Sequence, residues 1–74
     1  MKNKLKIDLH NIRHQSVFDV IEKSVRDKLR DPCSVEIITG RSQKMQQEVV
    51  SAFLSMGFKE SDIRIYPSFL LVEW

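Results

Sequence analysis

The residue types best suited to acid–base chemistry lie near the end of the first predicted strand. Asp8 and His10 are two residues apart, so on a strand their side chains would share one face at a separation of roughly 7 Å. A carboxylate held beside an imidazole can move a proton to or from a reacting oxygen. We therefore take Asp8 and His10 as the candidate catalytic pair.

A second segment has the residues of a phosphate site. Gly40 permits a sharp turn after a predicted strand, and Ser42 can cap the helix that follows. The amides of residues 41–44 would then point outward, beside the side chains of Arg41 and Lys44. Because the amino terminus of a helix favours anions, this segment is predicted to contact phosphate.

Apolar periodicity predicts the first strand and the first helix that would position these residues. Residues 4–10 alternate between polar and apolar side chains, which predicts a half-buried strand. Residues 14–30 carry apolar side chains at three- and four-residue spacing, which predicts an amphipathic helix ended by Asp31-Pro32. Ser16 and Asp19 have the spacing of a capping pair at its start, although the helix could begin as early as Asn11. The stripe of this helix comprises Val17, Phe18, Ile21, Val25 and Leu29.

A second strand and a second helix follow. Residues 34–39 are rich in β-branched side chains and end at Gly40, which predicts a strand. The next apolar stripe predicts a helix that ends at Gly57 and Phe58 in a Schellman motif. Its stripe comprises Met45, Val49, Phe53 and Met56, with Val50 and Leu54 beside them.

The last elements are two short strands, residues 62–66 and 69–73, close enough to form an antiparallel hairpin. The order is therefore β-α-β-α-β-β in a single domain, residues 1–74. Right-handed crossovers would make the first three strands parallel and place both helices on one face. We expect these residues to be buried: Leu5, Ile7, Leu9, Ile21, Val25, Phe53 and Met56.

The predicted fold class is an α/β two-layer sandwich with a four-stranded mixed sheet and both helices on one face. Its open face would display Lys6, Asp8 and His10. Ligands of such folds gather at the carboxyl ends of parallel strands, so both candidate segments are expected to meet at one edge of the sheet.

Composition excludes several classes of protein. A chain of 74 residues makes one small domain, and its 42% hydrophobic and 30% charged residues are ordinary for a globular protein. The longest strictly apolar run, residues 69–72, is too short to span a membrane, and we expect no signal peptide. A single cysteine, Cys33, forms no internal disulfide, which favours the cytoplasm. The net charge of +2 is not diagnostic, although the basic residues concentrate in the first half.

The two segments, in their order, resemble the Smr (small MutS-related) family. The family signature is a Leu-Asp-Leu-His-Gly strand end and a later Thr-Gly-x-Gly turn. Here the first motif is Ile7-Asp8-Leu9-His10-Asn11, followed by Ile12-Arg13-His14, and the second is Thr39-Gly40-Arg41-Ser42. The resemblance covers nearly the whole chain and extends to the order of its helices and strands.

The resemblance implies nucleic-acid processing. Nicking or RNA-cleaving endonuclease activity, and association with branched DNA or ribosomes, are properties of family members, whose fold is similar to the carboxyl-terminal domain of a bacterial translation initiation factor. The implied catalytic residues are Asp8 and His10. The implied nucleic-acid or phosphate contacts are Lys6, Asn11, Arg13, His14, Thr39, Gly40, Arg41, Ser42 and Lys44.

Two residues depart from the family pattern. Asn11 replaces the first motif's glycine, and Asn is the residue that best substitutes for glycine at positive φ. Ser42 replaces the second glycine, where its side chain either obstructs a phosphate or caps the second helix. We favour the cap.

Three functions from different classes fit these observations. The leading one is a small Smr-like nucleic-acid-binding domain with endonuclease activity. The alternatives are a non-catalytic adaptor that binds structured nucleic acid or the ribosome through the same edge, and a protein-interaction module. The last would use the apolar C-terminal strand and Trp74 as an edge-like surface for a weak dimer.

The expected partner is nucleic acid, either DNA or structured RNA, bound by a monomer. No membrane partner is expected. No cofactor is required by the sequence, and one carboxylate with one histidine is too small a set to predict a metal site, although a divalent ion is compatible with the chemistry.

Overall fold

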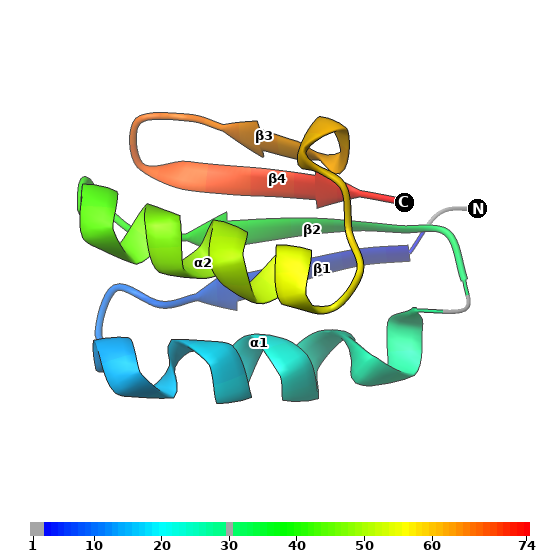
Figure 1. Ribbon diagram of the computed structural model, residues 1–74, viewed down its shortest axis with the longest axis horizontal. Helices are drawn as coiled ribbons and strands as arrows, with labels where there is room; N and C mark the ends of the chain where they lie inside the picture. Colours follow the sequence, from blue (N-terminus) through cyan, green and yellow to red (C-terminus); the bar gives the residue numbers. More distant parts are fainter. Residues whose placement is uncertain (1–2, 30) are drawn as a thin grey trace.

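Four strands form one sheet in the order β1-β2-β4-β3, and two helices cover one of its faces (Figure 1). This arrangement comes from a computed structural model, which describes residues 3–29 and 31–74. The predicted α/β two-layer sandwich is confirmed. The strands are β1 (Asn3–Asp8), β2 (Cys33–Ile38), β3 (Ile63–Ile65) and β4 (Phe69–Glu73), and the helices are α1 (Val17–Val25) and α2 (Gln43–Ser55).

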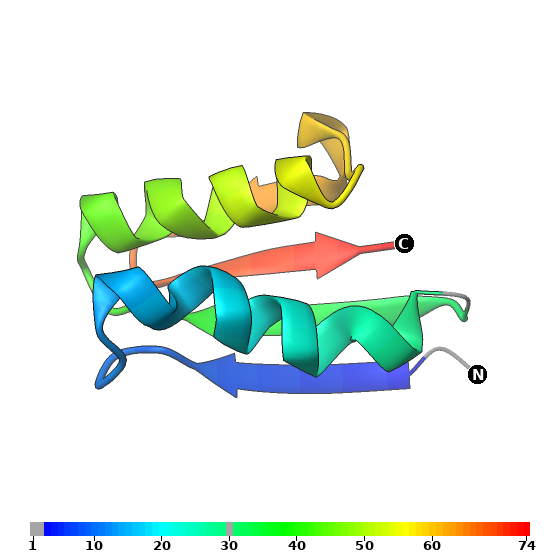
Figure 2. The same ribbon diagram turned by 60° about the horizontal axis from the view of Figure 1, so that its bottom comes forward.

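Strand directions explain why both helices lie on one side. β1 pairs with β2 in parallel, and β4 is antiparallel to both β2 and β3, so β1, β2 and β3 point the same way as predicted. The crossovers from β1 to β2 and from β2 to β3 both advance in one direction across the sheet. Right-handed connections of that kind place their helices on the same face, which Figure 2 shows.

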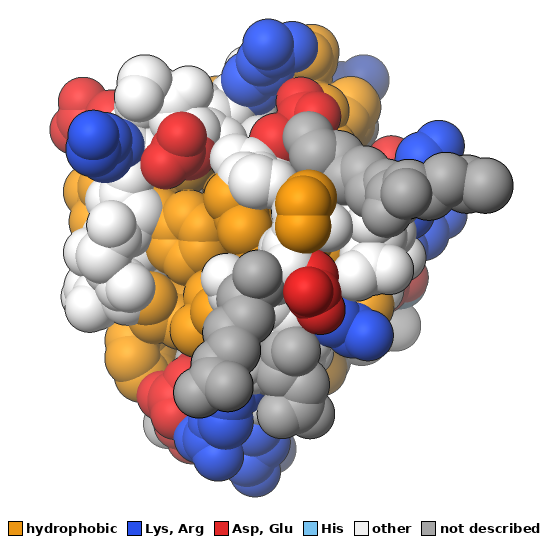
Figure 3. All heavy atoms as spheres, turned by 90° about the vertical axis from the view of Figure 1, so that its right-hand side faces the viewer, with side chains coloured by type: hydrophobic (Ala, Val, Ile, Leu, Met, Phe, Trp, Pro, Cys, Tyr) orange, Lys and Arg blue, Asp and Glu red, His pale blue; other side chains and the backbone are white. Residues whose placement is uncertain are grey.

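The expectation that the last strand is edge-like is wrong. β4 lies between β2 and β3, so both of its edges are hydrogen-bonded. Trp74 continues the pairing through two backbone bonds with Cys33, at 3.0 and 2.9 Å. Its ring packs edge-on against Phe58, with centroids 4.9 Å apart, and its Nε1 donates to the Lys28 carbonyl at 3.2 Å. Trp74 therefore closes this end of the core, where apolar side chains gather in Figure 3.

The buried core lies between the helices and the sheet. Ile7, Leu9, Ile21, Val25 and Phe53 are buried as predicted, together with the inward side chains of β2 and β4. Leu5 and Met56 were expected there too, and they are half-buried at its margin because β1 is an edge strand and Met56 lies at the end of α2.

The apolar stripe of the first helix is narrower than predicted. Val17, Ile21 and Val25, each four residues apart, face the sheet and are buried. Phe18 and Leu29 are each 43% exposed. Phe18 follows Val17 by one residue, or about 100° around the helix, and so turns toward solvent.

The first helix is also shorter than residues 14–30. A 3₁₀ turn, His14–Ser16, precedes α1, and another, Arg26–Lys28, follows it; Arg30 lies outside the described residues. Ser16 makes no side-chain capping bond, contrary to the predicted pair with Asp19. Its backbone is already helical, at φ −98° and ψ −5°, whereas a capping side chain needs an extended backbone. No helix in the described part of the chain is long and apolar enough to cross a membrane.

Both ends of α2 form as predicted. The Ser42 hydroxyl accepts a bond from the Met45 amide at 3.1 Å. At the other end the amides of Phe58 and Gly57 donate to the carbonyls of Phe53 and Leu54, both at 3.1 Å, which is the Schellman pattern. Gly57 has the φ of +97° that this motif requires, and the rings of Phe53 and Phe58 supply its apolar contact.

The Ser42 cap predicts a specific order of stabilities. Ser42→Ala removes the acceptor for the Met45 amide and should lower the free energy of unfolding by about 1 kcal/mol. Ser42→Gly should lower the free energy of unfolding by only a few tenths of a kcal/mol, because glycine is well tolerated at the N-cap of a helix. Chemical denaturation measures both, with Ser51→Ala, an exposed serine within α2, as the matched control. Equal losses for Ala and Gly would contradict a capping role.

Candidate functional site

Asp8 and His10 come together through a turn. Asp8 is the last residue of β1 and lies beside Ile38 of β2. The predicted strand over residues 4–10 therefore ends two residues early. The Leu9 amide still bonds to the Ile38 carbonyl at 2.8 Å, but a bond of 3.0 Å from the Ile12 amide to the Leu9 carbonyl then reverses the chain.

This turn folds His10 back onto Asp8. The backbone amide of His10 donates to Asp8 Oδ1 at 3.1 Å, and its ring Nδ1 contacts the same oxygen. The two side chains therefore touch, in place of the separation expected for neighbours on one face of a strand. Both remain about half exposed, at 54% for His10 and 52% for Asp8.

Contact with His10 lowers the pKa of Asp8. The ring of His10, and then its backbone amide, hold the pKa of Asp8 below its usual value of 3.8. The charges of His10 and Lys6 act in the same direction more weakly, and partial desolvation opposes them. Asp8 is thus a carboxylate at neutral pH, and Nδ1 of His10 must be the donor. Nε2 has no partner among the described residues.

The expected turn at Gly40 is present, and backbone hydrogen bonds to Ser68 hold it in place. Gly40 has a φ of +68°, and its amide and that of Thr39 donate to one carbonyl, Ser68, at 3.0 and 3.2 Å. A Cβ at Gly40 would meet nothing within 4 Å, so the backbone angle is what requires glycine. Thr39 is buried, and its hydroxyl donates to the Gly40 carbonyl at 2.8 Å, which places it inside the turn.

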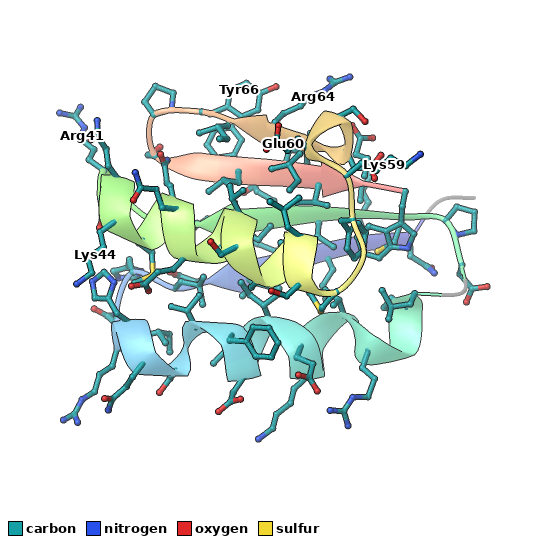
Figure 4. All side chains as sticks on the ribbon, in the orientation of Figure 1. Arg41, Lys44, Lys59, Glu60, Arg64 and Tyr66 are labelled. Carbon is teal, nitrogen blue, oxygen red and sulfur yellow. The ribbon has the colours of Figure 1, made fainter. Side chains whose placement is uncertain are left out.

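The amides of residues 41–44 are the candidate anion-binding feature of this edge. They have no hydrogen-bond partner in the described part of the chain, and they lie at the amino terminus of α2. Arg41 and Lys44 are exposed beside them (Figure 4). Since Asp8 lies beside Ile38, and Thr39 follows Ile38, the acid–base pair and these amides occupy one edge of the sheet.

The remaining predicted contacts are more scattered. Lys6 lies on the open face with its ammonium 4.0 Å from Glu36. Arg13 and Asn11 are exposed in the loop after β1. Asn11 does not adopt the positive φ expected of a glycine substitute, because the turn closed by Leu9 and Ile12 forms with ordinary backbone angles.

His14 is held by a residue that the sequence did not indicate. Its Nδ1 lies 3.0 Å from Glu48 Oε2, which ties the start of the first helical segment to α2. Lys44, one helical turn before Glu48, lines the same shallow groove between the helices. His14 and Lys44 therefore lie beside the carboxyl edge but turn toward the helical layer.

Sequence reasoning also missed the contribution of the β3–β4 turn. Ser68 supplies the carbonyl that orders Thr39 and Gly40, and Tyr66 and Phe69 stack beside it with centroids 4.6 Å apart. The hairpin was predicted, but its place next to β2 depends on the sheet order. No local signal in the sequence specifies that order.

Comparison with known proteins finds no match to this chain among family models, curated proteins or solved structures. The resemblance to the Smr family stays a prediction, carried by the two segments that meet at this edge.

The Asp8–His10 contact predicts a measurable titration. By NMR, the carboxyl of Asp8 should titrate below 3.8, and His10→Ala should return its pKa toward that value. Because folding lowers this pKa, the contact stabilises the fold above the carboxyl's unfolded pKa, and that stabilisation is lost as pH falls through the lower folded value. Lys6→Gln is the control and should raise the pKa less, since its charge is the weakest of these influences. An unchanged Asp8 titration in His10→Ala would refute the assigned cause.

Proposed function

We propose that this domain binds nucleic acid at the carboxyl edge of its sheet and cleaves a phosphodiester bond with the Asp8–His10 pair. The observation that carries the proposal is the turn after β1, which folds His10 onto an ionised Asp8 beside an anion-binding helix terminus. Orienting carboxylate, imidazole and phosphate-binding amides are the three parts that acid–base phosphoryl chemistry needs.

In this mechanism each residue has one task. The amides of residues 41–44, with Arg41 and Lys44, hold the phosphate and offset its charge. Nε2 of His10 takes the proton of the attacking hydroxyl, from water or from a ribose 2′-OH, and the imidazolium then returns that proton to the leaving oxygen as the P–O bond breaks. Asp8 holds the ring in one tautomer and stabilises the imidazolium that forms.

The exposure of this pair is consistent with a macromolecular substrate. Both side chains are about half exposed in the free domain, so their interaction is weakened by water. A nucleic acid lying over the edge would exclude that water and strengthen the interaction when the reaction takes place. We further propose that the domain acts as a monomer, because β4 is paired on both edges and Trp74 packs against Phe58. We also propose that it acts in the cytoplasm, since its single cysteine, Cys33, is buried and unpaired.

Cleavage tests the catalytic part of the proposal. Purified protein is incubated with labelled DNA and structured RNA, with and without divalent metal. His10→Ala should reduce cleavage by about 10²- to 10⁴-fold and leave binding intact, as expected for loss of a general base. Asp8→Asn should also reduce cleavage, whereas Asp19→Asn, which changes an exposed carboxylate on α1, should not. Binding by the wild type without any cleavage would instead identify a non-catalytic adaptor.

Salt dependence tests the phosphate contacts. The few basic side chains at this edge predict that log Kd changes with log salt concentration with a slope of magnitude about 2 to 4. Arg41→Ala should weaken binding by about 1 kcal/mol for all sequences alike and reduce the slope, as expected for one exposed phosphate contact. Lys23→Ala, on the exposed side of α1, is the matched control and should have a smaller effect. An affinity independent of salt would argue against phosphate binding.

A further inference from the structure

The open face of the sheet carries an apolar row that begins at the candidate site. Strand register places Asp8 beside Ile38, and Ile38 beside Phe69. Tyr66 lies opposite Phe69, because its amide donates to the Phe69 carbonyl at 2.9 Å. The row therefore runs from the end of β1 across β2 and β4 to the residue that follows β3. With adjacent strands about 4.8 Å apart, Tyr66 lies roughly 14 Å from Asp8.

The far end of this row is an aromatic platform made by Tyr66 and Phe69. Their rings are stacked with an interplanar angle of 9° and centroids 4.6 Å apart. Tyr66 is 37% exposed, so part of its ring is open to a further planar group. None of the core contacts or catalytic roles described above uses this exposed surface.

The platform is held in place before any ligand binds. Gln46 on α2 donates from Nε2 to the Tyr66 carbonyl at 2.7 Å and, more weakly, to that of Pro67 at 3.4 Å. The Ser68 carbonyl is fixed by the turn at Gly40. Stacking on such a rigid surface costs little conformational entropy, because few side chains need to be ordered.

Positive charge flanks the platform. Arg64 lies two residues before Tyr66, on the same face of the hairpin and opposite Leu71. Arg41 projects from the loop whose amides bond to Ser68 (Figure 4). Neither guanidinium has an ion-pair partner among the described residues. An exposed aromatic stack between two unpaired guanidinium groups complements a ligand that combines planar bases with phosphates.

We propose that the row from Asp8 to Tyr66 binds single-stranded nucleic acid, with an unpaired base stacked on Tyr66 and the cleaved phosphate at His10. A base inside a duplex has both faces covered by its neighbours and does not reach the ring, so the platform selects unpaired strands. The inference rests on the proposed function and adds to it the class of substrate.

Binding measurements with matched ligands test this inference. Fluorescence anisotropy compares a short labelled oligothymidylate and oligouridylate, alone and annealed to their complements. Wild-type protein should bind the single strands more tightly. Tyr66→Leu, which keeps an apolar side chain but removes the ring, should weaken single-strand binding on the order of tenfold, the scale of one lost base stack. It should leave duplex binding unchanged.

Two variants serve as matched controls. Tyr66→Phe keeps the ring and should retain the affinity for single strands. Phe18→Ala removes another exposed aromatic ring, on α1, and should have no effect. Thermal melts verify that each variant is folded.

A cross-linking experiment on the wild type needs no variant. Ultraviolet cross-linking to 5-iodouracil oligonucleotides, followed by trypsin, should label the peptide of residues 65–74 that cleavage after Arg64 releases. Labelling confined to other peptides would overturn the inference.

The outcomes separate the two proposals. If Tyr66→Leu binds single strands as well as the wild type while Arg41→Ala binds less, the platform is wrong and the proposed function stands. Tighter binding of duplex than of single strands by the wild type also overturns the inference alone. If no nucleic acid binds under any condition, the proposed function fails, and the inference fails with it.

Discussion

The central position of β2 is the constraint on which the rest of the structure depends. It pairs in parallel with β1 on one side and antiparallel with β4 on the other, so its last residues touch both neighbours. Its inward side chains, Val35 and Ile37, are fully buried beneath the helices. A shift of one residue in the β1–β2 pairing would turn the inward side chains of one of these strands to solvent and would displace Asp8 relative to the turn at Gly40.

The same strand organises the candidate site through its carboxyl end. Leu9 bonds to the Ile38 carbonyl, while Thr39 and Gly40 bond to Ser68, so three loops meet where β2 ends. Only one of these loops requires a glycine, at Gly40, where φ is +68°. The others reverse with ordinary backbone angles, so Asn11 needs no positive φ.

Ser42 stabilises the start of α2 and leaves the amides of residues 41–44 without partners among the described residues. Its hydroxyl caps α2 by accepting the Met45 amide, and this bond uses one of the free amides at the helix terminus. The amides of residues 41–44 stay available to an anion, so capping and phosphate binding are compatible at this end of the helix. The Ser42 hydroxyl therefore stabilises the start of α2 without bonding to the amides that a phosphate would use.

Much of the fold was determined by the sequence alone. Alternation in β1, the apolar stripe of α2 and its Gly57-Phe58 end are local patterns, and each produced the predicted element because burial and backbone preferences act over a few residues. The predictions were wrong where contacts with residues distant in the sequence determine the local structure. The first helix is flanked by 3₁₀ turns that leave Ser16 unable to cap, and β1 ends at Asp8.

The sequence also predicted that Asp8, His10 and the Gly40 turn lie at one edge of the sheet, because the right-handed crossover rule brings the ends of β1 and β2 together. It did not predict that His10 folds back onto Asp8, that Glu48 holds His14, or that Tyr66 and Phe69 stack beside the end of β2. Those contacts depend on a turn geometry and on a strand order, β1-β2-β4-β3, in which the last strand inserts beside β2. Such long-range pairing is set by burial summed over the whole sheet, and only the tertiary structure decides it.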